Sequence, residues 1–151
     1  MGTISKEQPL AELTLRKYEK PGNLTDRELV KKLCLSLGLL QAGDSRDVIV
    51  DVFMVLLSRK QLSSESIEQK VVEQRTSLKL PLIGIAGSNI RRQLLRLREA
   101  FLVEKVANEY RIAENAKLAD LFTEKIERYV LPSILGRIRE YLTEADERFK
   151  G

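Results

Sequence analysis

Residues 88–112 bring together side chains suited to binding an anionic polymer that carries bases. The candidates are a hydroxyl, two amides and five basic groups: Ser88, Asn89, Arg91, Arg92, Gln93, Arg96, Lys105 and Arg111. The guanidinium fork of arginine matches guanine edges and phosphate oxygens, and an asparagine or glutamine amide matches adenine. Free backbone amides at a helix start, beside a serine hydroxyl, can also hold a phosphate. These residue types predict noncovalent contact with double-stranded DNA.

The spacing of apolar residues predicts the element that carries most of these groups. Apolar side chains recur every three or four residues at Ile90, Leu94, Leu97 and Phe101, which gives one buried helical face. We therefore expect a helix over 89–100, capped by Ser88, whose other faces carry the polar and basic side chains. Such a helix has the size to enter the DNA major groove.

A short β-hairpin is predicted directly after this helix. Leu102–Val106 and Glu109–Ile112 read as strands, and Asn108, which tolerates positive φ, favours a tight turn between them. Lys105 and Arg111 then flank the tip of the hairpin. There they are placed to contact the DNA backbone or the minor groove.

The composition narrows the chemistry further. The chain has 151 residues, with 26 Lys and Arg against 22 Asp and Glu, and a net charge of +4. Residues 88–112 hold 6 basic and 3 acidic side chains, so the surplus concentrates in the helix and hairpin. There is no histidine, and the single Cys34 can form neither an intrachain disulfide nor a thiolate zinc site. We expect Cys34 to be a small buried hydrophobe.

No residue pattern predicts catalysis, a cofactor or a metal site. Gly84–Ser88 resembles a phosphate-binding loop only in part, because the lysine and the full glycine spacing are missing. Asp47 with Asp51, and Glu124 with Arg128, share helical faces, and we interpret both pairs as surface charges. We therefore predict that the chain is not an enzyme.

Two helices are expected early in the chain. Thr25 and Glu28 form a capping box that starts a helix over 26–37, and Gly38 ends it. A second helix, over 46–59, is apolar on nearly every side. That pattern predicts a central, buried helix.

The flanking segments are less regular. A third helix over 64–75, capped by Ser63, has few apolar residues and should lie at the surface. Residues 76–86 should form either a short strand or an extended loop. Residues 1–24 contain two prolines and little periodicity, so we expect a loosely docked or partly disordered arm.

Residues 114–151 carry an apolar stripe that continues past Pro132, which predicts either one kinked helix or two consecutive helices. The stripe must be covered, either by a second copy of the chain or by folding back onto residues 26–37. We favour a homodimer with the interface Leu118, Phe122, Ile126, Tyr129, Ile134, Ile138 and Tyr141. The longest apolar run is too short to cross a bilayer, and the start lacks the apolar core of a signal peptide. We therefore expect a cytoplasmic protein without membrane contact.

From about Arg46 to Ala113 the sequence resembles the winged helix-turn-helix superfamily of archaeal and bacterial transcription regulators. In its most specific part, Ser88-x-Ile90-Arg91-Arg92-x-Leu94-x-x-Leu97-x-x-x-Phe101-Leu102-Val103-Glu104 and Tyr110-Arg111-Ile112 are similar to a recognition helix and wing. Two features depart from the family. Phe101 stands where the family usually has glycine, and residues 76–87 are longer than its usual tight turn.

The resemblance implies a mainly α fold with a small β-hairpin. It implies an N-terminal arm (1–24), a winged-helix domain with an extra N-terminal helix (25–113) and a C-terminal helical dimerisation segment (114–151). The implied function is a DNA-binding transcriptional regulator that reads the major groove with 89–100 and contacts the backbone or minor groove with 102–112. The alternative is a winged-helix protein-interaction module that does not bind DNA. The sequence indicates no particular effector ligand.

Overall fold

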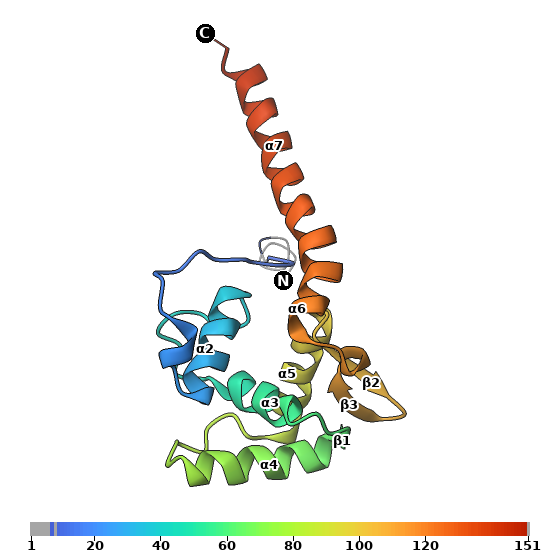
Figure 1. The fold of residues 1–151 in the computed structure, drawn as a ribbon. Helices are drawn as coiled ribbons and strands as arrows, with labels where there is room; N and C mark the ends of the chain where they lie inside the picture. The colour runs from blue at the N-terminus through green and yellow to red at the C-terminus, as the bar shows by residue number, and fades with distance from the viewer. Residues whose placement is uncertain (1–6, 8, 151) are drawn as a thin grey trace. The chain divides into compact units, whose positions relative to one another are not determined.

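The computed structural model describes Glu7 and residues 9–150; the part of the predicted arm in residues 1–6 and 8 lies outside the described residues. The fold is mainly helical, with a small three-stranded antiparallel sheet and a long C-terminal helix (Figure 1). The chain divides into two compact units, Met1–Asn115 and Ala116–Gly151. Within the described part of the chain, no helix combines the length and the apolar character needed to cross a membrane.

The first α-helix, α2 (Asp26–Ser36), begins with the predicted capping box. Thr25 Oγ1 accepts a hydrogen bond from the Glu28 amide at 3.2 Å, and the Glu28 carboxylate accepts one from the Thr25 amide at 3.0 Å. The Thr25 amide also holds the pKa of Glu28 below its usual value. Beyond the helix, Gly38 has φ of +73°, and a Cβ there would lie 2.7 Å from the backbone oxygen of Glu12. Glycine is therefore required by both conformation and space.

The extended segment before α2 is docked on it. The Thr14 amide donates to the Ser36 carbonyl at 3.0 Å, and the Thr14 hydroxyl donates to the Leu35 carbonyl at 3.1 Å. A short 3₁₀ turn, Pro21–Asn23, then leads into the helix. These bonds satisfy carbonyls at the C-terminal end of α2, which otherwise lack intrahelical partners.

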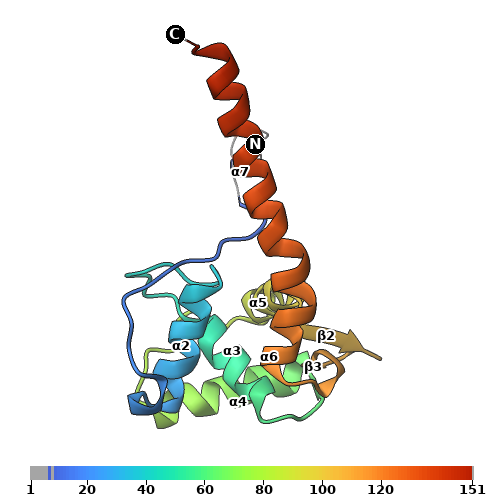
Figure 2. The same cartoon turned by 45° about the horizontal axis from the view of Figure 1, so that its top comes forward.

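Helix α3 (Val48–Leu57) is the centre of the first unit, and every residue in it except Met54 and Leu57 is buried. It packs against α2, α4 (Ser64–Ser77), α5 (Gly87–Glu99) and the sheet. Figures 1 and 2 both show α3 between α2 and the hairpin of β2 (Val103–Val106) and β3 (Glu109–Ile112). The prediction of a central buried helix is confirmed, although the helix is shorter than the predicted 46–59. Cys34 is fully buried, as predicted, and burial raises the pKa of its thiol to about 12.

Asp47 and Asp51 are not the surface charges predicted from sequence. Asp51 is fully buried; Arg75 Nη1 donates to it at 2.6 Å and Gln74 Nε2 at 2.9 Å, and Arg27 also donates to it. Asp47 accepts hydrogen bonds from Arg27 Nη2 and Arg75 Nη1, both at 3.0 Å. The prediction was wrong because the two arginines come from α2 and α4, far away in the sequence. We call Arg27, Asp47, Asp51 and Arg75 the ion cluster. The other pair, Glu124 and Arg128, is exposed as predicted.

The ion cluster ties α4 to the core more tightly than the sequence indicated. Ser63 caps this helix by accepting from the Ser66 amide at 3.2 Å, as predicted. Arg75 was expected on a surface helix but is only 2% exposed, and its Nε donates to the Pro81 carbonyl at 2.7 Å. Between α4 and α5 the chain forms an extended loop rather than a strand.

The hairpin consists of β2 (Val103–Val106) and β3 (Glu109–Ile112), paired antiparallel with Val103 opposite Ile112. Its turn residues have positive φ, +51° at Ala107 and +65° at Asn108, so the predicted tight turn is confirmed. The sequence did not predict β1 (Leu62–Ser63), which pairs with β3. The strand order is β1-β3-β2.

The second unit is one helical run with three parts. Helix α6 (Leu118–Leu121) leads into a π-helical segment (Phe122–Val130), and α7 (Leu131–Arg148) follows. Pro132 lacks an amide hydrogen and its ring crowds the carbonyl four residues earlier. The wider π geometry lies directly before this proline, and it accommodates the interruption within a continuous helix.

Candidate nucleic-acid interface

Helix α5 carries most of the predicted DNA-binding residues, and its start differs from the prediction. The helix begins at Gly87 with Ala86 as its N-cap, and the amides of Asn89 and Ile90 both donate to the Ala86 carbonyl. Ser88 therefore lies inside the first turn, exposed, and is not the cap. Ile90 on the opposite side of the helix is fully buried, together with the predicted Leu94 and Leu97.

One edge of α5 holds the two amides and Arg96 in a chain of internal hydrogen bonds. Asn89 Nδ2 donates to the Gly84 carbonyl at 2.6 Å, and Gln93 Nε2 donates to Asn89 Oδ1 at 3.0 Å. Arg96 donates to Gln93 Oε1 at 2.9 Å and to the Leu39 carbonyl at 2.7 Å. These three side chains fix α5 to the loops before α3 and α5. In this arrangement they position the helix.

The outward face of α5 carries three other arginines. The side chains of Arg91, Arg92 and Arg98 are exposed. They form no hydrogen bond or ion pair with another described residue. Leu95 lies among them and is also exposed. We call these three arginines the basic face. Sequence reasoning omitted Arg98, although its spacing of seven from Arg91 places both on one side of a helix.

The two predicted cations of the hairpin have different surroundings. Arg111 Nε donates to Glu104 Oε2 at 2.6 Å, and the backbone amide of Glu114 donates to the same oxygen at 2.9 Å. That amide, and secondly Arg111, lower the pKa of Glu104. Lys105 is exposed, and its Nζ lies 5.7 Å from the centre of the Tyr110 ring. Of the two cations, Lys105 is the one without a carboxylate partner among the described residues.

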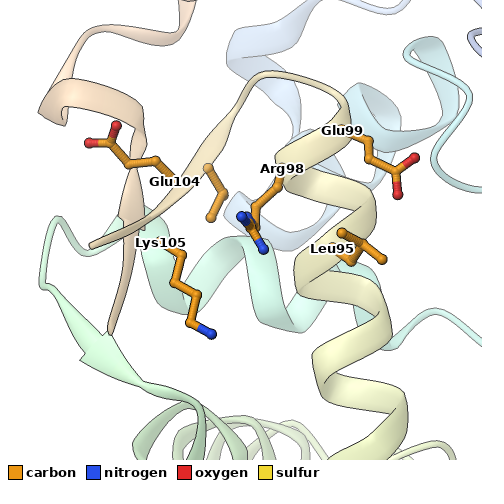
Figure 3. Close-up of a pocket in the computed structure, with 6 residues that line it drawn as sticks. Leu95, Arg98, Glu99, Glu104 and Lys105 are labelled. Carbon is orange, nitrogen blue, oxygen red and sulfur yellow. The ribbon is translucent and has the colours of Figure 1, made fainter. Parts of the chain in front are cut away.

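A shallow hollow of about 400 Å³ lies where α5 meets β2, lined by Leu95, Arg98, Glu99, Val103, Glu104 and Lys105. Figure 3 shows Arg98 extending from α5 toward β2, with Glu104 and Lys105 leaving the strand on opposite sides. Alternation of side chains along a strand explains that separation. The hollow brings Arg98 and Lys105 from two elements to one concave place, where the carboxylates of Glu99 and Glu104 also lie at the lining.

The turn that joins α5 to β2 fixes the angle between helix and hairpin. Phe101 has φ of +66°, the left-handed region that glycine enters freely and bulky residues rarely do. The Leu102 amide donates to the Leu97 carbonyl at 3.1 Å, which closes the end of α5. Phe101 thus adopts a backbone conformation that glycine enters more readily.

No protein-family model, curated protein or solved structure matches this chain. Among the described residues, no group of three or more Cys, Asp or Glu is placed to hold a metal ion.

Proposed function

We propose that this chain is a DNA-binding transcriptional regulator of the winged helix-turn-helix type. The order of α3, α4, α5 and the β2–β3 hairpin, with a long helix after it, agrees with the order of elements that the resemblance implies. In this assignment α5 is the recognition helix and the β2–β3 hairpin is the wing. The extra N-terminal helix is α2, and the second unit is the C-terminal segment.

The observation that carries the proposal is the basic face beside the wing. Three exposed arginines, none paired with a carboxylate in the described part of the chain, leave a concentrated positive charge that an anion would neutralise. A helix of the length of α5 fits the major groove, and arginine is the residue that most often reads guanine there. Arg98 and Lys105 at the hollow then contact the phosphates beside the groove.

This assignment changes which residues we expect to contact DNA. The amides of Asn89 and Gln93 already serve as donor and acceptor inside the chain, as does Arg96. We therefore propose that the basic face and Lys105 make the contacts with bases and phosphates. Because phosphate contacts supply much of the affinity of such a surface, we expect binding with strong salt dependence.

The test is fluorescence anisotropy of a labelled random-sequence duplex over a salt series. Wild type should bind, with a steep loss of affinity as salt rises. The triple variant Arg91→Ala/Arg92→Ala/Arg98→Ala should bind about 100-fold more weakly at low salt. Its log–log salt slope should fall by about 2 to 3, roughly one for each lost phosphate contact.

A charge-matched control comes from the second unit. Lys125→Ala/Arg128→Ala/Arg139→Ala removes the same net charge from three exposed positions. This control should leave the affinity within about twofold of wild type if binding is local to the basic face. Equal losses in both triple variants, or no wild-type binding at low salt, would contradict the proposal.

A second candidate is a protein-interaction module, and exposed apolar residues near α5 favour it. Leu78, Leu82 and Ile83 on the loop before α5 are about half exposed, as is Leu95 on α5 itself. Apolar side chains grouped in this way are typical of protein contacts. In that case the duplex would not bind at any salt concentration, and Leu82→Ser with Ile83→Ser would abolish capture of the protein partner.

A further inference from the structure

Helix α7 carries an apolar stripe that is exposed along its length. The structure describes all of α7, and none of its residues is buried. Large apolar side chains are exposed at Leu131, Leu135, Ile138, Tyr141 and Leu142, and Phe149 just beyond the helix is 85% exposed. A soluble surface seldom carries such a continuous apolar strip without a partner.

The spacing of the stripe is that of a helix that pairs with another helix. Apolar residues alternate at steps of three and four through Leu131, Ile134, Ile138, Tyr141 and Ala145. This is the seven-residue repeat in which two positions face a partner helix. Leu135, Leu142 and Phe149 widen the stripe along one flank.

The charges beside the stripe select the direction of pairing. The first half of α7 holds Arg137 and Arg139, and the acidic residues Glu140, Glu144, Asp146 and Glu147 follow in the second half. Two copies aligned in parallel would bring like charges together. Two antiparallel copies would place Arg137 of each beside Glu144 of the other, twice in one symmetric pair.

We propose that α7 pairs antiparallel with α7 of a second copy of this chain. The helix runs from Leu131 to Arg148, and its midpoint falls between residues 139 and 140. An antiparallel pair centred there overlaps the whole stripe with itself. In this register Ile138 faces Tyr141 of the second copy, and Ile134 faces its Ala145.

The exposed area is sufficient for a small stable interface. Burying an aromatic side chain removes an area on the order of 150–250 Å² from water, and Tyr141 and Phe149 are nearly fully exposed. With the half-exposed aliphatic residues, the stripe offers on the order of 600 Å² per copy. Two copies then reach about 1,200 Å², the lower limit for specific interfaces.

The pairing surface is shorter than the dimer interface predicted from sequence. Ile126 is only 4% exposed within a single chain, so we exclude it from the surface. The proposed pairing involves α7 alone, so it also excludes three predicted residues that precede this helix: Leu118, Phe122 and Tyr129. Of the predicted interface, the proposal keeps Ile134, Ile138 and Tyr141.

Glu144 already has a partner in its own helix, since Arg148 Nε lies 2.9 Å from Glu144 Oε2. Both side chains are mostly exposed, and an exposed pair of this kind contributes little. Its second carboxylate oxygen is available to Arg137 of the other copy. The existing pair therefore holds Glu144 at the edge of the stripe without preventing the cross-pair.

The first test measures mass by light scattering on the full chain, whose single-copy mass is 17.2 kDa. Wild type should have twice that mass, and Ile138→Asp should have the single-copy mass with an unchanged circular dichroism spectrum. The control Thr143→Asp, on the opposite side of α7, should stay dimeric. A monomeric wild type, or a dimeric Ile138→Asp, would overturn the proposal.

The second test determines direction by oxidative cross-linking, with buried Cys34 left in place. Ala145→Cys alone should not cross-link, because the two copies of this residue lie about 16 Å apart along an antiparallel pair. A mixture of Ala145→Cys and Ile134→Cys should cross-link. Cross-linking of Ala145→Cys to itself would show a parallel pair and overturn the direction.

A charge swap keeps the proposal testable even where an apolar variant misfolds. Arg137→Glu and Glu144→Arg should each weaken the dimer about tenfold, because each places like charges opposite one another. The double variant Arg137→Glu/Glu144→Arg should restore it, as should mixing the two single variants. Failure of both restorations would overturn the pairing register. None of these measurements involves DNA, so the proposal stands or fails separately from the proposed function.

Discussion

Arg75 and Arg92 lie on helices of the same compact unit, yet their surroundings are opposite. Arg75 is 2% exposed and contacts Asp47, Asp51 and the Pro81 carbonyl, whereas Arg92 is exposed and has no recorded partner among the described residues. A buried guanidinium paired with two carboxylates serves the fold, because removing it leaves those carboxylates without compensation. An exposed guanidinium without a partner has its donors available to an external anion. We therefore propose that the arginines of the ion cluster stabilise the fold and that those of the basic face bind an external anion.

The largest expected effect comes from Asp51→Asn, which removes the buried carboxylate from the ion cluster. The change leaves Arg27 and Arg75 facing a neutral amide in a buried site, and we expect a loss of about 3–5 kcal/mol in the free energy of unfolding. Urea denaturation measures it. At temperatures where the variant is folded, DNA affinity should equal that of wild type. The exposed control Asp120→Asn should change stability by less than about 0.5 kcal/mol.

Arg96 tests whether an arginine on α5 stabilises the fold or binds DNA. It lies on the same helix as the basic face, but it donates a hydrogen bond to the Leu39 carbonyl. Arg96→Ala should cost about 2 kcal/mol in unfolding free energy, since it removes charge-assisted hydrogen bonds and leaves that carbonyl unpaired. Its effect on DNA affinity should be smaller than that of Arg92→Ala, which in turn should barely alter stability. The reverse ranking would return Arg96 to the binding surface.

Several features of the fold follow from local sequence, because each depends on residues close together in the chain. The Thr25–Glu28 capping box spans three residues, and the hairpin turn depends on Asn108. The buried position of α3 follows from a helix that is apolar all round. In each case the residues that determine the element are its own.

The remaining features depend on residues distant in sequence. From the sequence alone Asp51 is interpreted as a surface charge, because its partners Arg27 on α2 and Arg75 on α4 are distant in the chain. Strand β1 has two residues and exists through its pairing with β3. The division of α5 between Asn89, which bonds to Gly84, and the basic face likewise depends on loops outside the helix. Sequence spacing located the helix but not which of its polar residues are free.

Asp47 gives a pH-dependent test of the ion cluster. Burial acts to raise its pKa, but hydrogen bonds and charge from Arg75 and Arg27 outweigh burial and lower the pKa below 3.8. A carboxyl with a lowered folded-state pKa stabilises the fold above its unfolded pKa, and that contribution is lost as pH falls through the folded value. At pH 7, Asp47→Asn should be about 1–2 kcal/mol less stable than wild type. Urea midpoints should converge below about pH 4, and a difference that stays constant down to pH 2 would contradict the assignment.

The smallest expected effect on stability lies at Phe101, in the turn that connects α5 to the hairpin. A left-handed backbone costs a non-glycine residue about 1 kcal/mol or more, and glycine avoids this cost but loses more entropy on folding. Phe101→Gly should therefore change stability by less than about 1 kcal/mol. Phe101→Ala also removes the ring but keeps the strained φ, so it should be less stable than Phe101→Gly by up to about 1 kcal/mol. Both variants should bind DNA as wild type does, because the angle of the turn is retained. If the alanine variant is as stable as the glycine variant, the backbone at Phe101 is not strained, and the orientation of the hairpin relative to α5 must have another cause.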